Sequence, residues 1–264
     1  MTFIAAMDHS GGSTGGVLER YGQEYTEEDK MIKVHEMRLR MVNSPNFNSN
    51  NIWAAILYQD TVERGMVPIL KEKGIESYLK IDSGCEDTGY LKYFGCDEMI
   101  KYAIANGCTG TKMRSIVKTH DILNPILTQQ FALAKSISDA GLMPIVEPEV
   151  PIDFGDKGGL EAELKNALSE HLAVYDGKCI LKLTLPDNPN LYNEISQLDN
   201  VHKVVGLSGG YSTDEACNRL SQNNNMTASF SRALSEGLYV HQTDQEFEDA
   251  INKNIKMIVE ASNR

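Results

Sequence analysis

Short runs of apolar and β-branched residues alternate along the chain with longer stretches of helical character. Eight runs predict β-strands, at 3–8, 52–57, 78–81, 109–113, 143–147, 179–183, 203–207 and 227–230. Strands that alternate with helices favour a parallel sheet with crossover helices, and eight units in 264 residues fit a closed barrel. We therefore predict an α/β fold, a (β/α)8 TIM barrel. A doubly wound open sheet is the alternative, although six strands normally suffice there.

The predicted helices have recognisable ends. Thr26, Ser212 and Thr243 each stand three positions before an acidic residue, as in a helix-capping box. A helix that begins near Pro125 is expected to end at Gly141, where the next strand follows directly. No linker or low-complexity tract divides the chain, so we expect one domain over residues 1–264.

Composition narrows the class of protein. The net charge of −12 argues against a nucleic acid or a membrane surface as partner, because both attract basic proteins. There is no secretory signal at the N-terminus and no apolar run long enough to span a membrane. Five widely spaced cysteines suit reduced thiols. We expect a cytoplasmic location.

Ionisable residues stand repeatedly where the predicted strands end. In a (β/α)8 barrel the active site lies at these carboxyl ends. The spacing i, i+2 also places two pairs, Lys112 with Arg114 and Glu147 with Glu149, on the same face of their strands. Buried charges are costly unless they are paired or functional. The candidates are Asp8, Lys80, Asp82, Lys112, Arg114, Glu147, Glu149 and Lys182.

Lys182 lies inside an otherwise apolar strand at 179–185. Taken alone, a lysine that extends to solvent or pairs with a carboxylate is an equally good interpretation. Alternatively, burial and a neighbouring cation such as Lys112 favour the neutral amine near pH 7. A neutral buried amine can attack a carbonyl and form an iminium, which promotes cleavage of an adjacent carbon–carbon bond.

The segment Glu147-Pro148-Glu149 supplies the proton transfers that this chemistry needs. Expelling the carbinolamine hydroxyl requires a carboxyl group of raised pKa, and two close carboxylates push their pKa values apart. A solvated strand edge or a divalent-metal site is the other interpretation. A metal is disfavoured because the histidines are scattered, without H-x-H or H-E-x-x-H spacing.

Two glycine-rich turns are candidates for phosphate binding, because glycines let backbone N–H groups approach an anion at a helix N-terminus. One contains Ser208 and Gly209, with Arg232 just beyond the eighth strand. The other runs from Ser10 through Ser13 to Gly16. Barrels commonly hold phosphate after strands seven and eight. These residues indicate amine catalysis on a phosphorylated carbonyl substrate but do not identify the sugar.

Several motifs together resemble class I (Schiff-base) fructose-bisphosphate aldolases of the bacterial-type branch. They occur in family order over essentially the whole chain: Phe3-Ile-Ala-Ala-Met-Asp8 with Ser10-Gly-Gly-Ser13, Gly110-Thr-Lys112-Met-Arg114, Pro144-Ile-Val-Glu147-Pro-Glu149, Leu181-Lys182-Leu183, Leu207-Ser-Gly-Gly210 and Ser229-Phe-Ser-Arg232. The resemblance implies reversible cleavage of fructose 1,6-bisphosphate to dihydroxyacetone phosphate and glyceraldehyde 3-phosphate, with no metal and no cofactor.

The resemblance also implies roles for the catalytic residues. Lys182 would form the Schiff base, and Glu147, with Glu149 beside it, would be the acid and base of iminium formation. Asp8 would act on the C4 hydroxyl. Lys112 would stabilise charge and help keep Lys182 neutral, with Arg114 nearby. The C1 phosphate would be held by Ser208, Gly209 and Arg232, and the C6 phosphate by Lys80, Ser10 and Ser13.

Three features depart from the family pattern. A serine, Ser83, replaces the second lysine of the family's Lys-Val-Asp-Lys-Gly motif. The chain also starts at its first strand, without the usual leader helix, and ends without a terminal tyrosine. A Schiff-base aldolase for another phosphosugar and a non-catalytic phosphosugar-binding barrel are the alternatives. Assembly into a homo-oligomer is compatible with the sequence.

Overall fold

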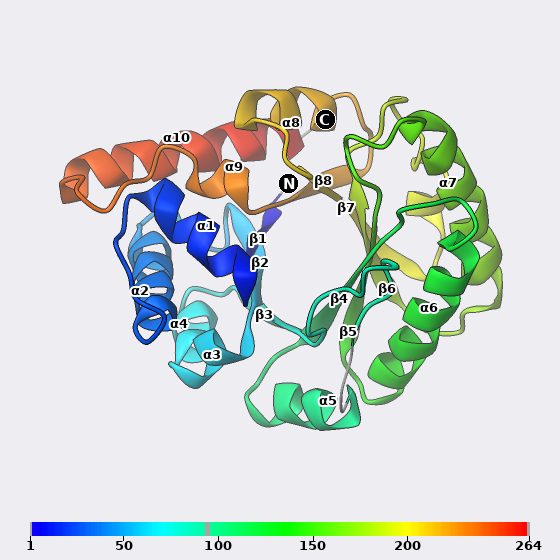
Figure 1. Ribbon diagram of the computed structural model, residues 1–264, viewed down its shortest axis with the longest axis horizontal. Coiled ribbons are helices and arrows are strands. Elements are labelled where there is room, and N and C mark those ends of the chain that lie inside the picture. Colours follow the sequence, from blue (N-terminus) through cyan, green and yellow to red (C-terminus); the bar gives the residue numbers. More distant parts are fainter. Residues whose placement is uncertain (1, 93–95, 263–264) are drawn as a thin grey trace.

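The computed structural model describes residues 2–92 and 96–262, in which eight parallel strands form a closed barrel (Figure 1). The strands are β1 (Phe3–Met7), β2 (Ile52–Leu57), β3 (Glu76–Lys80), β4 (Gly110–Ile116), β5 (Met143–Glu149), β6 (Cys179–Thr184), β7 (Val201–Leu207) and β8 (Met226–Phe230). They are hydrogen-bonded in chain order, and β8 closes the ring by pairing Ser229 with Ile4. The predicted (β/α)8 barrel is confirmed, and the open-sheet alternative is wrong.

Helices cover the outside of this barrel (Figure 1). They are α1 (Gly12–Tyr21), α2 (Lys30–Asn43), α3 (Gln59–Glu63), α4 (Met66–Glu72), α5 (Cys96–Ala105), α6 (Leu123–Asp139), α7 (Lys157–Val174), the 3-10 helix η1 (Ile195–Gln197), α8 (Thr213–Leu220), α9 (Arg232–Ser235) and α10 (Asp244–Ser262). Within residues 2–92 and 96–262, none of them is both long and apolar enough to cross a membrane.

The hydroxyl contacts predicted at Thr26, Ser212 and Thr243 are present, but Thr26 is not the N-cap of a helix, since α2 begins at Lys30 after Asp29 and has no side-chain cap. In each, a hydroxyl accepts the backbone N–H of an acidic residue three positions on, at 3.3 Å, in the pairs Thr26–Asp29, Ser212–Glu215 and Thr243–Glu246. The Thr26 turn leads into α2. Gly141 ends α6 with a positive φ of 82°, a conformation that glycine adopts at no steric cost.

Side chains alternate between the two faces of each strand, and the inward-facing positions form two layers. The lower layer is an apolar plug of Ile4, Ala6, Ala54, Ile56, Tyr78, Ile145, Ile180 and Val205. Two residues further along the same strands, the inward positions become charged, as in Ala6 to Asp8, Tyr78 to Lys80, Ile145 to Glu147 and Ile180 to Lys182. The apolar plug therefore forms the floor beneath a charged layer at the carboxyl ends.

The outward faces of the strands pack against the helices in a larger apolar core. Phe3 and Leu57 from strands and Leu127 and Leu164 from helices are fully buried there. Burying one such side chain contributes about 1.5–3 kcal/mol. This double-sided burial holds each strand rigidly and so fixes the inward charged side chains.

Two strands extend by two or more residues beyond their predicted ends, and β6 extends by one, to Thr184. β4 continues to Ile116 and β5 to Glu149, because their ladder persists through the pairs Arg114–Glu147 and Ile116–Glu149. Sequence patterning places the ends too early because polar residues in a paired strand look like the start of a loop.

Candidate active site

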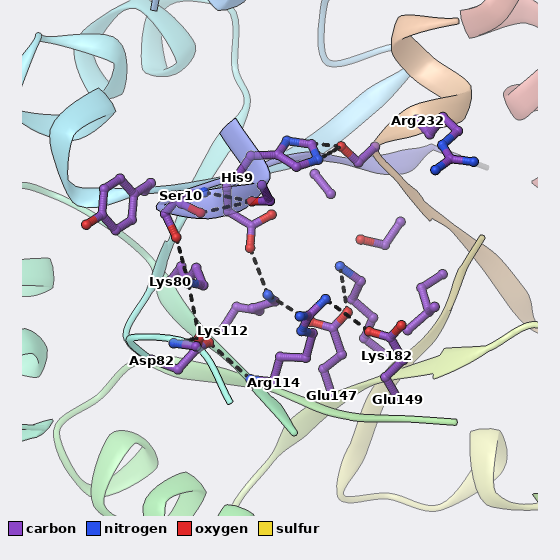
Figure 2. Close-up of a pocket in the computed structure, with 18 of the residues that line it drawn as sticks. His9, Ser10, Lys80, Asp82, Lys112, Arg114, Glu147, Glu149, Lys182 and Arg232 are labelled. Carbon is purple, nitrogen blue, oxygen red and sulfur yellow. Dashed lines mark hydrogen bonds and ion pairs between the residues drawn. The ribbon is translucent and has the colours of Figure 1, made fainter. Parts of the chain in front are cut away.

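A cavity of about 640 Å³ opens at the carboxyl ends of the strands. Each side chain assigned to the site from the sequence contributes to its wall: Asp8, Ser10, Ser13, Lys80, Lys112, Arg114, Glu147, Glu149, Lys182, Ser208, Gly209 and Arg232. Figure 2 shows the labelled members converging from different strands. The i, i+2 spacing does place Lys112 with Arg114, and Glu147 with Glu149, on the side of the cavity.

A continuous chain of ion pairs crosses the floor of this cavity. Lys182 Nζ lies 3.1 Å from Glu147 Oε1, and Lys112 Nζ lies 3.0 Å from Glu147 Oε2. Lys112 Nζ also donates to Asp8 Oδ2 at 2.7 Å. Lys182, Glu147 and Lys112 are each 3–4% exposed. The residue expected to attack a carbonyl is therefore in direct contact with a carboxylate that can accept its proton.

The shared lysine controls the charge state of both carboxylates. Burial alone would raise the pKa of Asp8, but the charges of Lys112 and Lys182 lower it well below its usual value. The pKa of Glu147 is likewise raised by burial and lowered overall by the same two lysines. Burial would lower the pKa of Lys112, and its two carboxylate neighbours raise it above its usual range. At neutral pH Lys112 is a fixed cation between two carboxylates.

The two carboxyl groups after Val146 have pKa values shifted in opposite directions. Burial raises the pKa of Glu149, and the nearby Glu147 raises it further, against the lowering effect of Arg114. Arg114 Nη1 lies 3.2 Å from Glu149 Oε2. The separation of the two pKa values is the one expected for two close carboxyl groups. The raised pKa, however, belongs to Glu149 and not to Glu147, the expected acid. The pKa of Glu147 is the lowered one, through Lys112 and Lys182 acting against burial.

A second cluster lies on the side of β1 and β3. Lys80 Nζ contacts Ser10 Oγ at 2.9 Å and Asp82 Oδ1 at 3.1 Å. Asp82 also accepts the backbone N–H groups of Gly84 and Arg114, so it is firmly oriented. Ser13 lies in the first turn of α1 and donates its hydroxyl to the carbonyl of Ser10 at 2.9 Å. Hydroxyls and one buried ammonium are thus grouped beside a helix N-terminus.

The turn after β7 and the start of α9 form the opposite side. Gly209 and Gly210 have positive φ values of 58° and 118°, which non-glycine residues rarely adopt. Arg232 Nη1 donates to the carbonyl of Gly210 at 3.1 Å, and Ser208 is buried against the cavity. Figure 2 shows Arg232 and Lys80 on opposite sides of the pocket.

Sequence reasoning missed several cavity residues, among them His9. Its Nε2 lies 3.1 Å from Ser231 Oγ, and its carbonyl accepts from Arg38 Nη2 at 2.9 Å. Burial lowers the pKa of His9 to about 4, so the ring is neutral at physiological pH. Successive strand residues point to opposite faces, so the position after Asp8 gave no signal. The other missed residues are Arg20, Tyr58, Ser229 and Ser231.

The carboxylates of the site face lysines and arginines. Within residues 2–92 and 96–262, no group of three or more His, Cys, Asp or Glu side chains is arranged to hold a metal ion. Cys85, Cys108, Cys179 and Cys217 are free thiols, and burial raises the pKa of each. The side chain of Cys96 lies outside the described part of the structure.

The fold and site define an enzyme class, in which a (β/α)8 barrel holds a buried lysine amine for covalent chemistry on a carbonyl. Comparison with curated proteins then identifies the family. Class 1 fructose-bisphosphate aldolases of Clostridium acetobutylicum and of Synechocystis sp. are each 43% identical over 279 aligned residues, covering 98% of this chain and 95% and 93% of theirs. The chain belongs to the class 1 fructose-bisphosphate aldolase family. No family model matches it.

Solved structures agree on the fold. A Plasmodium falciparum fructose-bisphosphate aldolase, in complex with TRAP and an inhibitor, has a TM-score of 0.82 at 19% identity, covering 99% of this chain and 90% of its own. An archaeal fructose-1,6-bisphosphate aldolase, with its catalytic lysine bound to a carbinolamine intermediate, has a TM-score of 0.55 at 10% identity, covering 96% and 93%. At these identities the likeness establishes the barrel alone.

Proposed function

We propose that the protein catalyses reversible aldol cleavage of fructose 1,6-bisphosphate, in glycolysis and gluconeogenesis, through a Schiff base on Lys182. The observation that carries the proposal is the contact of Lys182 with Glu147 within the ion-pair chain to Lys112 and Asp8. Full-length similarity to class 1 aldolases gives the substrate. The free thiols support a cytoplasmic location. Assembly into a homo-oligomer stays a prediction.

Formation of the Schiff base begins with a proton transfer over the 3.1 Å between Lys182 and Glu147. The free amine attacks the C2 ketone, and the resulting carbinolamine carries a hydroxyl group. Glu147, now protonated, gives its proton to that hydroxyl, water leaves and the iminium forms. Lys112 stays charged throughout and stabilises the carboxylate form of Glu147 before and after the transfer.

Asp8 is the base for carbon–carbon cleavage. Its pKa is lowered by Lys112 and Lys182 against the effect of burial, so it is ionised at neutral pH and accepts the proton of the C4 hydroxyl. The C3–C4 bond breaks, and its electron pair moves into the iminium to give an enamine. Glyceraldehyde 3-phosphate leaves; protonation of the enamine at C3 and hydrolysis of the iminium release dihydroxyacetone phosphate.

The two phosphates bind at opposite sides of the cavity. The ketone carbon C2 adjoins C1, so the C1 phosphate lies near Lys182, at the β7 turn with Ser208, Gly209 and Arg232. The C6 phosphate lies four carbons from C2, toward Lys80, Ser10 and Ser13. Glu149 and Arg114, paired at 3.2 Å, flank the reaction centre.

Borohydride reduction in the presence of dihydroxyacetone phosphate tests the proposal directly. We expect a covalent adduct on Lys182 by intact mass and peptide mapping, unaffected by chelator and absent in Lys182→Arg. Lys178→Arg is the matched control, because Lys178 is exposed just before the opposite end of the same strand. An adduct elsewhere, or activity abolished by EDTA and restored by a divalent ion, would overturn the assignment.

Substrate identity is tested separately. Comparison of fructose 1,6-bisphosphate with fructose 1-phosphate distinguishes a bisphosphate aldolase from a Schiff-base aldolase for another phosphosugar. We expect a higher kcat/KM for the bisphosphate, since a second phosphate-binding cluster is present around Lys80. Equal values for the two sugars would contradict that part of the proposal.

A further inference from the structure

Arg20 lies at the active site but belongs neither to a barrel strand nor to the ion-pair chain. It lies in the last turn of α1 and lines the active-site cavity together with Ser10 and Ser13. Ser13 and Arg20 are seven positions apart, so they share one face of the helix. Long side chains on a helix lean toward its N-terminus, which directs the Arg20 guanidinium toward the Ser10–Ser13 turn.

Gly16 has no side chain, so it leaves space for the Arg20 side chain to lie toward the N-terminus of α1. It lies on the same helical face, between Ser13 and Arg20. A Cβ atom at Gly16 would lie 3.5 Å from Arg20 Nη1, so the guanidinium folds back along the helix over this glycine. The charge of Arg20 also contributes to the lowered pKa of His9, behind burial and Arg38, which is consistent with its position near the cavity.

The balance of charge in the cavity singles out Arg20. The wall contains six lysine and arginine side chains but four aspartate and glutamate side chains among the described residues. Lys80, Lys112, Arg114 and Lys182 each have a carboxylate partner. Arg20 and Arg232 form no ion pair within residues 2–92 and 96–262. Arg232 lies on the side of the cavity where the C1 phosphate is proposed to bind.

The C6 phosphate needs a cation that the predicted cluster does not supply. A phosphate monoester carries about −1.5 to −2 charges at pH 7, and Lys80 is largely neutralised by Asp82 at 3.1 Å. Ser83, which also lines the cavity, is neutral and donates its hydroxyl to the carbonyl of Lys92. Among the described residues Arg20 is an unpaired cation of the cavity wall, and it lies on the helix that begins beside the hydroxyls of Ser10 and Ser13.

We propose that Arg20 is a specificity-determining residue that binds the C6 phosphate and supplies the positive charge that Lys80, paired with Asp82, does not. This inference rests on the proposed function, because it assumes a bisphosphate substrate. Guanidinium groups bind phosphate through two parallel N–H donors, an arrangement that suits an otherwise unpartnered arginine. Arg20 then selects fructose 1,6-bisphosphate over fructose 1-phosphate and takes no part in the chemical steps.

The test compares Arg20→Gln, Arg20→Lys and Lys71→Gln with the unsubstituted enzyme. Lys71 is an exposed cation on α4 that does not line the cavity, so its loss changes net charge equally. We expect Arg20→Gln to lower kcat/KM for the bisphosphate about tenfold and to leave that for fructose 1-phosphate unchanged. Arg20→Lys should restore most of the loss, and Lys71→Gln should match the unsubstituted enzyme.

Two readouts separate this inference from the function on which it rests. Trapping with dihydroxyacetone phosphate, which has no C6 phosphate, should give the same Lys182 adduct in Arg20→Gln and in the unsubstituted enzyme. An adduct with unaltered selectivity between the two sugars, or an equal loss on both, refutes the role of Arg20 alone. Absence of the adduct from the unsubstituted enzyme refutes the proposed function.

Discussion

Lys182 Nζ and Glu147 Oε1 lie 3.1 Å apart in a cavity where both side chains are almost fully buried. Because the opposite oxygen of Glu147 contacts Lys112, one carboxylate serves two ammonium groups. A carboxylate in this position can take a proton from Lys182 without losing its electrostatic partner. This arrangement explains how a buried lysine can become a nucleophile beside a permanently charged one.

Glu147→Gln tests whether this carboxyl group moves the proton. The amide keeps the shape of the side chain but cannot accept a proton from Lys182. We expect kcat to fall by about 10²- to 10⁴-fold, with slower borohydride trapping of dihydroxyacetone phosphate measured in a time course.

Glu149→Gln is the matched control for that experiment. Glu149 pairs with Arg114, whereas Lys182 pairs with Glu147, so an amide at Glu149 should disturb the proton transfer less. We expect a loss of less than about tenfold in kcat. A larger effect at Glu149 than at Glu147 would reverse the assignment of the acid and base.

Lys112→Met should change the pH dependence of catalysis. Lys112 is the charge that contributes most to lowering the pKa values of Asp8 and Glu147 against the effect of burial. Without it both pKa values rise, so both carboxylates are protonated at a higher pH than before. We expect the acidic limb of the kcat/KM profile to move to higher pH and kcat to fall by about 100-fold or more.

Lys118→Met is the control for Lys112. Lys118 lies in the loop after the same strand, is exposed, and donates to the carbonyl of Asp87. Its removal should leave the acidic limb in place. An unchanged limb in Lys112→Met would show that Lys112 does not set the charge state of Asp8 and Glu147.

Much of this site could be predicted from the sequence because barrel strands impose a strict order. Inward positions recur every second residue, so an apolar residue such as Ile180 on the inner face predicts that Lys182 also faces inward. The same period brought Lys112 and Glu147 together from different strands. The order of motifs along the chain then identified the family.

Other features depend on distances that a sequence does not contain. The raised pKa at Glu149 and the lowered one at Glu147 follow from which carboxylate lies nearer to Lys112 and Lys182. Arg20 was missed because it lies on a helix, whereas the site residues predicted from the sequence lie at strand ends and in glycine-rich turns. The spacing of Ser13, Gly16 and Arg20 on one helical face was the signal that was available.

His9→Gln should flatten the dependence of stability on pH under mildly acidic conditions. The folded-state pKa of His9 is about 4, below its unfolded value near 6.5, chiefly because of burial. Between these values the unfolded chain binds a proton that the folded one does not, so stability falls as pH decreases from 6.5 toward 4. Between pH 6.5 and 5 we expect the free energy of unfolding of His9→Gln to fall by about 1 kcal/mol less than that of the unsubstituted protein, measured by urea unfolding.

The backbone conformation of Gly209 does not accommodate a side chain without strain. Its φ is +58°, and an added Cβ would lie 2.7 Å from Ile152 Cγ2, so alanine there is strained and shifts the turn. Since this turn lines the cavity where we propose that the C1 phosphate binds, Gly209→Ala should raise KM about tenfold for both fructose 1,6-bisphosphate and fructose 1-phosphate. Gly237→Ala is the control, because Gly237 also has a positive φ, +73°, but has open space around it and does not line the cavity. It should cost about 1 kcal/mol of stability without changing KM. If Gly237→Ala raised KM as much as Gly209→Ala, backbone strain in general, and not the phosphate turn, would be responsible.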